Sequence, residues 1–106
     1  MSRYMFIARY DSTGAQGVVA KGGRARATAI EKAAADLGGR METFDFAFGE
    51  DDVFTLCELP DNRAAAAIAL AVNSAGLAHV RTVVLMTPED VDVASRQSVN
   101  YAAPGT

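Results

Sequence analysis

Four short segments of the chain are rich in aromatic and branched side chains and are bounded by Gly, Pro, Asp or Ser. They cover residues 3–10, 40–48, 53–59 and 80–87. Such segments predict β-strands, and residues 40–48 also alternate between phenylalanines on one side and Thr, Asp and Ala on the other. Residues 40–48 and 53–59 are too close in sequence for a crossover helix between them, so they predict an antiparallel hairpin.

Helical signals follow the first predicted strand. A helical stretch is expected to begin at a cap formed by Ser12 or Thr13 and to run to about Lys21. Two adjacent glycines then disfavour a helix interior, and the helical pattern resumes over residues 24–37. We expect one helical segment with a flexible joint. The glycines predicted to form the joint and to end the helix are Gly22, Gly23, Gly38 and Gly39.

The second half of the chain repeats the strand and helix pattern. Residues 62–75 predict a helix capped by Asp61, and Pro88 begins a last short helical segment. The order strand, helix, strand, strand, helix, strand predicts an α+β, ferredoxin-like split βαβ sandwich, with a four-stranded antiparallel sheet and two main helices on one face. The length of 106 residues fits one domain, assigned to residues 1–97, with a flexible C-terminal tail at residues 98–106.

The predicted strands are apolar on both faces. In the first strand, for example, Met5 and Ile7 lie on the side opposite Tyr4 and Phe6. An antiparallel sheet with water on one face should alternate apolar and polar residues, and two helices can cover only one face. The simplest way to cover the second face is with another copy of the chain. We therefore expect a homodimer, or a higher homo-oligomer, in which sheet packs against sheet.

The helix predicted over residues 62–75 has no charge after Arg63 and carries alanine around most of its circumference. Ile68 and Val72 form a stripe suited to the sheet. A surface helix ordinarily carries charged residues on the face turned away from the core, and this helix does not. We therefore expect either residues 88–98 or a neighbouring subunit to cover that face. The high helix propensity of alanine is an alternative explanation for the composition.

Composition and charge narrow the function classes. The net charge of −3 gives the chain no affinity for nucleic-acid phosphates or anionic membranes. One cysteine, Cys57, and one histidine, His79, exclude an intrachain disulfide and a conventional soft-metal site, and no cofactor is predicted. No secretory signal or membrane span is visible, so a cytoplasmic protein is expected, and the excess of alanine and of arginine over lysine suggests a GC-rich bacterial genome.

From about Tyr4 to Asp90 the chain resembles the GYD-domain family, small bacterial proteins of uncharacterised function. The pieces that carry the resemblance are Tyr10 at the end of the first strand, Gly14, Leu37-Gly38-Gly39-Arg40, Phe48-Gly49-Glu50, Pro60-Asp61, Val80-Arg81-Thr82, and Thr87 near Glu89. The family's name motif has a tyrosine between Glu50 and Asp52, where this chain has Asp51, whereas Gly49 and Asp52 match. The resemblance implies a subunit of the dimeric α/β-barrel class. That class includes monooxygenases, isomerases and haem-degrading enzymes, but shared architecture does not transfer chemistry.

Four residues are candidates for ligand binding: Tyr10, Asp45, His79 and Arg81. His79 titrates near neutrality and is the default general base, although it begins a strand where a solvated side chain is ordinary. Asp45 lies within a strand, where a carboxylate needs a partner, and Arg9 or Arg81 could supply it across a subunit contact or at a cavity edge. We expect Asp45 or Arg81 to be partly buried in a charge-assisted hydrogen bond.

We expect structural roles for the other chemically reactive residues. Cys57 lies mid-strand and is expected in the core. The acids at residues 50–52 could suggest a hard-cation site, but a solvated hairpin turn accounts for them better, and no metal is predicted. The aromatic residues offer enough surface for an apolar pocket, although most such stripes are core.

Two functional hypotheses follow. In the first, the protein binds a small, mostly apolar molecule in an apolar pocket between sheet and helices of a dimeric α/β barrel. In the second, it is a non-catalytic assembly or regulatory module whose main chemistry is self-association. The residues leave open whether any reaction is catalysed.

Overall fold

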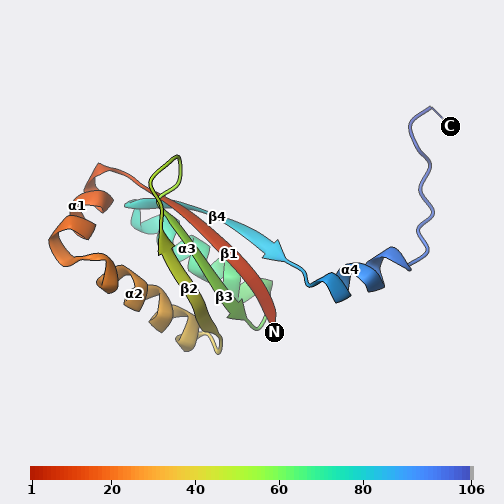
Figure 1. Cartoon of the computed structure of the whole chain (residues 1–106), viewed down its shortest axis with the longest axis horizontal. Coiled ribbons are helices and arrows are strands. Elements are labelled where there is room, and N and C mark those ends of the chain that lie inside the picture. Colours follow the sequence, from red (N-terminus) through yellow and green to blue (C-terminus); the bar gives the residue numbers. More distant parts are fainter. Residues whose placement is uncertain (106) are drawn as a thin grey trace.

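A computed structural model describes residues 1–105 (Figure 1). The chain forms a four-stranded sheet with helices in the predicted order. The elements are β1 (Ser2–Tyr10), α1 (Ser12–Lys21), α2 (Gly23–Asp36), β2 (Arg40–Phe46), β3 (Val53–Leu59), α3 (Asn62–Ala75), β4 (Ala78–Leu85) and α4 (Pro88–Ser95). The predicted joint separates α1 from α2 at Gly22, whose φ of 84° lies in the left-handed region that favours glycine.

The sheet has the strand order β2-β3-β1-β4, and every neighbouring pair is antiparallel. This confirms the α+β ferredoxin-like arrangement and the predicted hairpin. Helices α2 and α3 pack against the same face of the sheet; in Figure 1, α3 lies behind the strands and α2 lies to the left of β2. The core forms between them and the sheet. Its buried members are Tyr4, Phe6, Ala34, Cys57, Leu59, Ala64, Ala65 and Ile68.

The helix caps agree with the sequence analysis in one case and correct it in another. Asp61 caps α3 as predicted, because its Oδ1 accepts a hydrogen bond from the backbone N–H of Ala64 at 3.0 Å. Helix α1 is capped by Asp11, not by Ser12 or Thr13. The backbone of Asp11 is extended, and its Oδ1 accepts from the N–H of Gly14 at 2.7 Å.

The second strand is shorter than predicted. A β-bulge between Met41 and Thr43 changes the alternation, and β2 ends at Phe46. Phe44 and Phe46 remain on the helix-covered side of the sheet, with their ring centroids 5.3 Å apart. Phe48 lies beyond the strand in the hairpin loop and is fully exposed, so its predicted place in the strand is wrong. Likewise, β4 begins two residues earlier than predicted, at Ala78, and ends at Leu85.

Two glycines allow close approaches between backbones. A Cβ atom on Gly14 would lie 2.2 Å from the carbonyl oxygen of Leu77, where α1 meets the start of β4. A Cβ atom on Gly39 would lie 2.1 Å from the carbonyl oxygen of Glu58, where β2 begins beside β3. Both positions belong to the pieces that resemble the GYD family, and their glycines are required for packing.

The last helix extends away from the domain (Figure 1). Thr87 and Asp90 form a capping box at its start, but none of its residues is buried. Helix α4 therefore does not cover the outer side of α3, where Leu70 is 69% exposed, and the prediction that residues 88–98 provide this cover is wrong. Cover by a neighbouring subunit stays a prediction.

The polar C-terminal segment after α4 has no helix or strand as far as it is described, and its residues are exposed. The domain boundary at residue 97 and the flexibility of residues 98–106 stay predictions. Thr106, the last residue of that predicted tail, lies outside the described residues.

Candidate functional site

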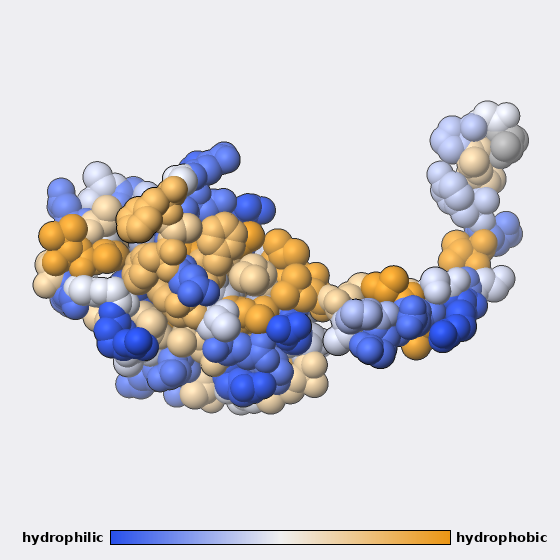
Figure 2. Space-filling model, viewed as in Figure 1, coloured by the Kyte–Doolittle hydropathy of each residue, from blue (hydrophilic) through white to orange (hydrophobic). Residues whose placement is uncertain are grey.

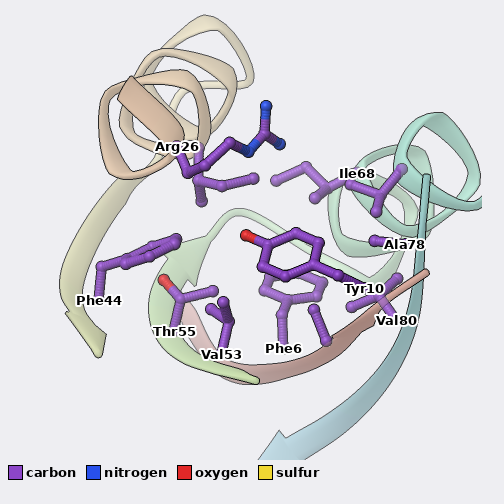
Figure 3. Close-up of a pocket in the computed structure, with 12 residues that line it drawn as sticks. Phe6, Tyr10, Arg26, Phe44, Val53, Thr55, Ile68, Ala78 and Val80 are labelled. Carbon is purple, nitrogen blue, oxygen red and sulfur yellow. The ribbon is translucent and has the colours of Figure 1, made fainter. Parts of the chain in front are cut away.

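An apolar cavity of about 40 Å³ lies between the sheet and the helices α2 and α3 (Figure 3). Side chains from all four strands form its floor, and side chains from the two helices form its roof. The lining residues are Phe6, Ala8, Tyr10, Arg26, Ile30, Phe44, Val53, Thr55, Ile68, Val72, Ala78 and Val80. Most of this surface is hydrocarbon, so the space favours an apolar occupant.

A larger groove of about 560 Å³ adjoins the cavity where α1 and α2 face the C-terminal half of α3. The groove and the cavity share five lining residues, among them Tyr10 and Arg26. Figure 3 shows Arg26 extending from α2 toward the gap between α2 and α3, above the ring of Tyr10. These two residues therefore mark the junction between the apolar cavity and the groove. The other shared residues are Ile30, Val72 and Ala78.

The loop between β2 and β3 holds Tyr10 in place. The backbone N–H of Tyr10 donates to Oδ2 of Asp52 at 2.9 Å, and the N–H of Asp52 donates to the carbonyl of Ala8 at 2.8 Å. The N–H of Asp11 donates to the carbonyl of Leu77 at 3.1 Å. These contacts fix both sides of the Tyr10 backbone. Asp52 is thus a positioning residue for the cavity, not the solvated turn residue that the sequence suggested.

The polar groups of the cavity are few. Thr55 is buried, but its hydroxyl donates to the carbonyl of Thr43 at 2.8 Å, so its hydrogen bond is used within the sheet. The groups left for a ligand are the Tyr10 hydroxyl and the Arg26 guanidinium. Arg26 is half-buried, and within residues 1–105 it forms no ion pair. Arg26 is thus a partly buried cation beside apolar walls, and no carboxylate of the described chain pairs with it. It is a candidate group for binding an anion.

The structure separates the four predicted ligand-binding residues. Tyr10 lines the cavity, whereas Asp45, His79 and Arg81 lie on the opposite face of the sheet. His79 and Arg81 border a shallow hollow there that also contains Arg9. His79 is exposed. The sheet lies between these three residues and the cavity, so they cannot act on the same small molecule as Tyr10.

Asp45 and Arg81 do not pair within one chain. They lie on β2 and β4, the two edge strands, with β3 and β1 between them. Arg81 instead donates to Asp51 at 3.3 Å, and 64% of its side chain is exposed. Asp45 is also exposed. The expected charge-assisted hydrogen bond thus forms at Arg81, but the expected partial burial is found for neither residue in the single chain.

The carboxylates of the hairpin loop and the cysteine have structural contacts. Asp51 pairs with Arg81, and Asp52 holds the Tyr10 backbone. Across the described chain, no group of three His, Cys, Asp or Glu side chains is arranged to hold a metal ion. Cys57 is buried in the core, as predicted, and burial raises the pKa of its thiol, which lowers its reactivity.

The second face of the sheet carries an apolar centre. The three-strand register puts apolar residues of β1, β3 and β4 side by side on the face away from α2 and α3. Figure 2 views this face and shows hydrophobic side chains over the middle of the sheet, with hydrophilic ones below them. We call this the open face. Its apolar residues are Met5, Ile7, Phe54, Leu56, Val83 and Leu85.

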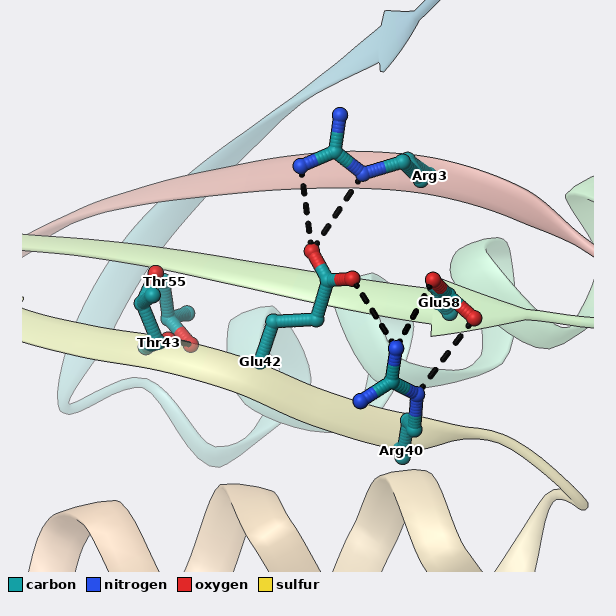
Figure 4. Close-up of polar contacts among 6 residues, drawn as sticks. All are labelled: Arg3, Arg40, Glu42, Thr43, Thr55 and Glu58. Carbon is teal, nitrogen blue, oxygen red and sulfur yellow. Dashed lines mark hydrogen bonds and ion pairs between the residues drawn. The ribbon is translucent and has the colours of Figure 1, made fainter.

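A network of ion pairs borders one end of the open face (Figure 4). Glu42 pairs with Arg3 at 3.1 Å and with Arg40 at 3.2 Å, and Arg40 also pairs with Glu58 at 3.0 Å. Hydrogen bonding to Glu58 raises the pKa of Arg40, and hydrogen bonding to Arg40 lowers the pKa of Glu58. The four side chains satisfy one another's hydrogen bonds and charges, so they form a polar rim beside the apolar centre.

The architecture is that of an α+β protein of the ferredoxin-like class, with an apolar cavity between its sheet and its helices. The sequence matches the GYD domain over residues 4–94, and the chain therefore belongs to the GYD-domain family. No curated protein and no solved structure matches the chain. None of the helices in residues 1–105 is long and apolar enough to cross a membrane.

Arg26 is the cavity residue that the sequence analysis missed. A signal for it existed, because Arg26, Ile30 and Ala33 are spaced four and three residues apart and share one face of α2. A charged residue on the apolar stripe of a core-facing helix indicates that this residue binds a polar partner at the edge of the core. The role of Asp52 had no comparable signal, since its partner is a backbone N–H 42 residues away.

Proposed function

We propose that this protein binds a small, mostly apolar molecule in the space between the sheet and the helices α2 and α3, as one subunit of a dimeric α/β barrel. The observation that carries the proposal is the apolar cavity between the sheet and the helices, with a groove of about 560 Å³ next to it. That groove volume falls within the range of roughly 300–1,000 Å³ found for small-molecule sites.

The cavity alone holds a few water molecules, since each needs roughly 10–15 Å³. An organic ligand therefore extends from the cavity into the groove and separates α2 from α3. The break at Gly22 joins α1 to α2 through a single left-handed residue, which gives α2 a point about which it can move. Apolar contact with Phe6, Ile30 and Ile68 supplies the binding free energy.

The lining supports binding more directly than catalysis. Its only side chains with ionisable or hydroxyl groups are Tyr10, Arg26 and Thr55, and the Thr55 hydroxyl is already used. A general base of ordinary pKa or a nucleophilic thiol is not among them. A reaction at this site would depend on the reactivity of the bound molecule itself.

The test compares two variants of one helix. Ile68→Trp fills the cavity, whereas Leu70→Trp adds the same side chain at an exposed position of α3. We expect native mass spectrometry of the purified protein to show a co-purified organic molecule that is retained by Leu70→Trp and lost from Ile68→Trp. Equal retention by both variants would place the molecule elsewhere and contradict the proposal.

A second candidate function, self-association, is favoured by the open face. Its six apolar residues lie together on a surface that none of the helices in residues 1–105 covers, and charged residues border them. Ile7 is buried, Val83 is exposed and the other four are partly exposed in the single chain. An apolar cluster of this kind that reaches the surface favours an interaction surface. A second copy of the chain is a suitable partner, because the open face carries a carboxylate at one edge and a guanidinium at the other.

A further inference from the structure

The groove next to the cavity is basic although the protein as a whole is acidic. We infer that the ligand of this site is an apolar molecule with one anionic group, a carboxylate or a similar oxyanion, and that Arg26 binds this group while the apolar part fills the cavity. This inference rests on the proposed function. It adds the chemical class of the ligand, which the apolar walls alone do not define.

The charges along the groove support an anion. Its lining includes Lys21 and Arg26 but no aspartate or glutamate, in a chain with 13 acids against 10 bases. In the described part of the chain, neither cation forms an ion pair, whereas Arg3, Arg40 and Arg81 all do. The lining of the groove therefore carries a positive formal charge, and a ligand carboxylate would supply the missing counter-charge.

The position of Arg26 defines the orientation of the ligand. Arg26 extends from α2 into the gap between α2 and α3 on the helix side of Tyr10, and both residues line the cavity and the groove (Figure 3). A guanidinium presents parallel N–H donors that match the two oxygens of a carboxylate. The Tyr10 hydroxyl is a further donor at the same junction. An anionic group bound here leaves the rest of the molecule directed toward Phe6, Ile68 and the other apolar walls.

The same arrangement disfavours other ligands. A neutral molecule of the same shape would leave the half-buried guanidinium without a counter-charge and would cover it from water, which is costly. A cationic molecule would in addition be repelled by Arg26 and Lys21. The site is thus expected to select the anion by roughly ten- to a hundredfold over its neutral isostere, as for other hydrogen bonds to charged groups.

Two probes of nearly equal shape test the inference: 4-phenylbutyrate and 4-phenylbutan-1-ol. Binding of each is measured by titration calorimetry to the full chain and to two variants. Arg26→Gln removes the charge at the cavity, and Arg24→Gln removes an exposed charge from the same helix that does not line the site. Circular dichroism confirms that each variant is folded.

We expect the carboxylate to bind at least tenfold more tightly than the alcohol, and Arg26→Gln to abolish this difference without weakening the alcohol. Arg24→Gln should retain the difference. Equal affinity of the two probes for the unmodified chain, both displaced by Ile68→Trp, would overturn the inference while leaving the proposed function intact. Binding of neither probe, together with no effect of Ile68→Trp on any co-purified molecule, would overturn both.

Discussion

Asp45 and Arg81 lie at opposite ends of one row of residues across the open face. Asp45 is paired in register with Phe54, Phe54 with Ile7, and Ile7 with Arg81. The row spans three strand spacings, or about 14 Å. It therefore carries a negative charge at one edge of the sheet, a positive charge at the other, and apolar side chains between them.

This row is self-complementary under one kind of symmetry. A two-fold axis that runs along the strands, between two stacked sheets, reverses the direction of the row in the second copy. Each Asp45 then faces an arginine, and each Arg81 faces an aspartate. A two-fold axis along the row would instead oppose like charges, which is unfavourable. The charges thus favour the first arrangement for a sheet-to-sheet dimer.

Charge exchange tests this arrangement. We expect Asp45→Arg to weaken the dimer, because it opposes two cations, and the double variant Asp45→Arg with Arg81→Asp to recover at least part of the loss. Glu31→Arg, on the exposed side of α2, makes the same charge change away from the open face and should have little effect. Sedimentation equilibrium gives the dimer dissociation constants. Each single variant, Asp45→Arg and Arg81→Asp, changes the free energy of dimer dissociation by some amount. If the double variant loses as much of this free energy as the two single variants added together, the predicted symmetry is contradicted.

The apolar centre of the open face is expected to hold the dimer together. Leu56→Arg places a charge among Met5, Phe54 and the other apolar residues, so it should yield a folded monomer of about 11.1 kDa by light scattering. Val19→Arg, at an exposed apolar position of α1, provides the matched control away from this face. If the unmodified chain is already a monomer at micromolar concentration, self-association through this face is wrong.

We predict opposite effects on stability for an alanine at Gly14 and an alanine at Gly17, which both lie in α1. An alanine at Gly14 would place its Cβ 2.2 Å from the carbonyl oxygen of Leu77, whereas nothing lies within 4 Å of the corresponding position at Gly17. Gly14→Ala should lower the free energy of unfolding by about 2 kcal/mol or more. Gly17→Ala should raise it by about 0.5–1 kcal/mol, because alanine favours the helix. Urea denaturation measures both, and equal effects would show that the close approach at Leu77 is not a constraint.

Because the thiol of Cys57 is buried, we predict that the free energy of unfolding decreases at high pH. Burial raises the pKa of Cys57 above its ordinary value of 9.0, so the folded chain keeps the proton after the unfolded chain has lost it. The stability is thus complete below that ordinary pKa and falls as the pH rises past it. As the pH rises from about 8 to about 10, the unmodified chain should lose more of its free energy of unfolding than Cys57→Ala in urea denaturation. Equal losses would mean that Cys57 ionises as easily in the folded chain as in the unfolded one.

The fold was predictable because its signals are local. The apolar strand segments, the glycine breaks and the Asp61 cap each depend on a few neighbouring residues, and together they define the split βαβ order. The cap of α1 was misplaced by one or two residues because Asp11, Ser12 and Thr13 can all act as caps. The end of β2 was misplaced because the bulge and the hairpin loop depend on pairing with β3, which the alternation of Phe48 with the preceding residues does not reveal.

The site was less predictable because strand order decides which residues meet. The sequence grouped Tyr10 with Asp45, His79 and Arg81 as candidate residues, but neighbouring positions on a strand point to opposite faces of the sheet. Only Tyr10 points to the helices. Arg26 reaches the cavity from a different element, and its position depends on how α2 crosses the sheet.

Intermolecular nuclear Overhauser effects test the central claim, that a small apolar molecule binds between the sheet and the helices α2 and α3. The chain is labelled at the methyl groups of Ile, Leu and Val, and 4-phenylbutyrate is added as the probe. We predict contacts from the phenyl ring to methyl groups of Ile30, Ile68 and Val80, which line the cavity, and none to Leu56 or Val83 on the open face. Contacts to Leu56 and Val83 without any to Ile68, or no contacts at all, would contradict the account.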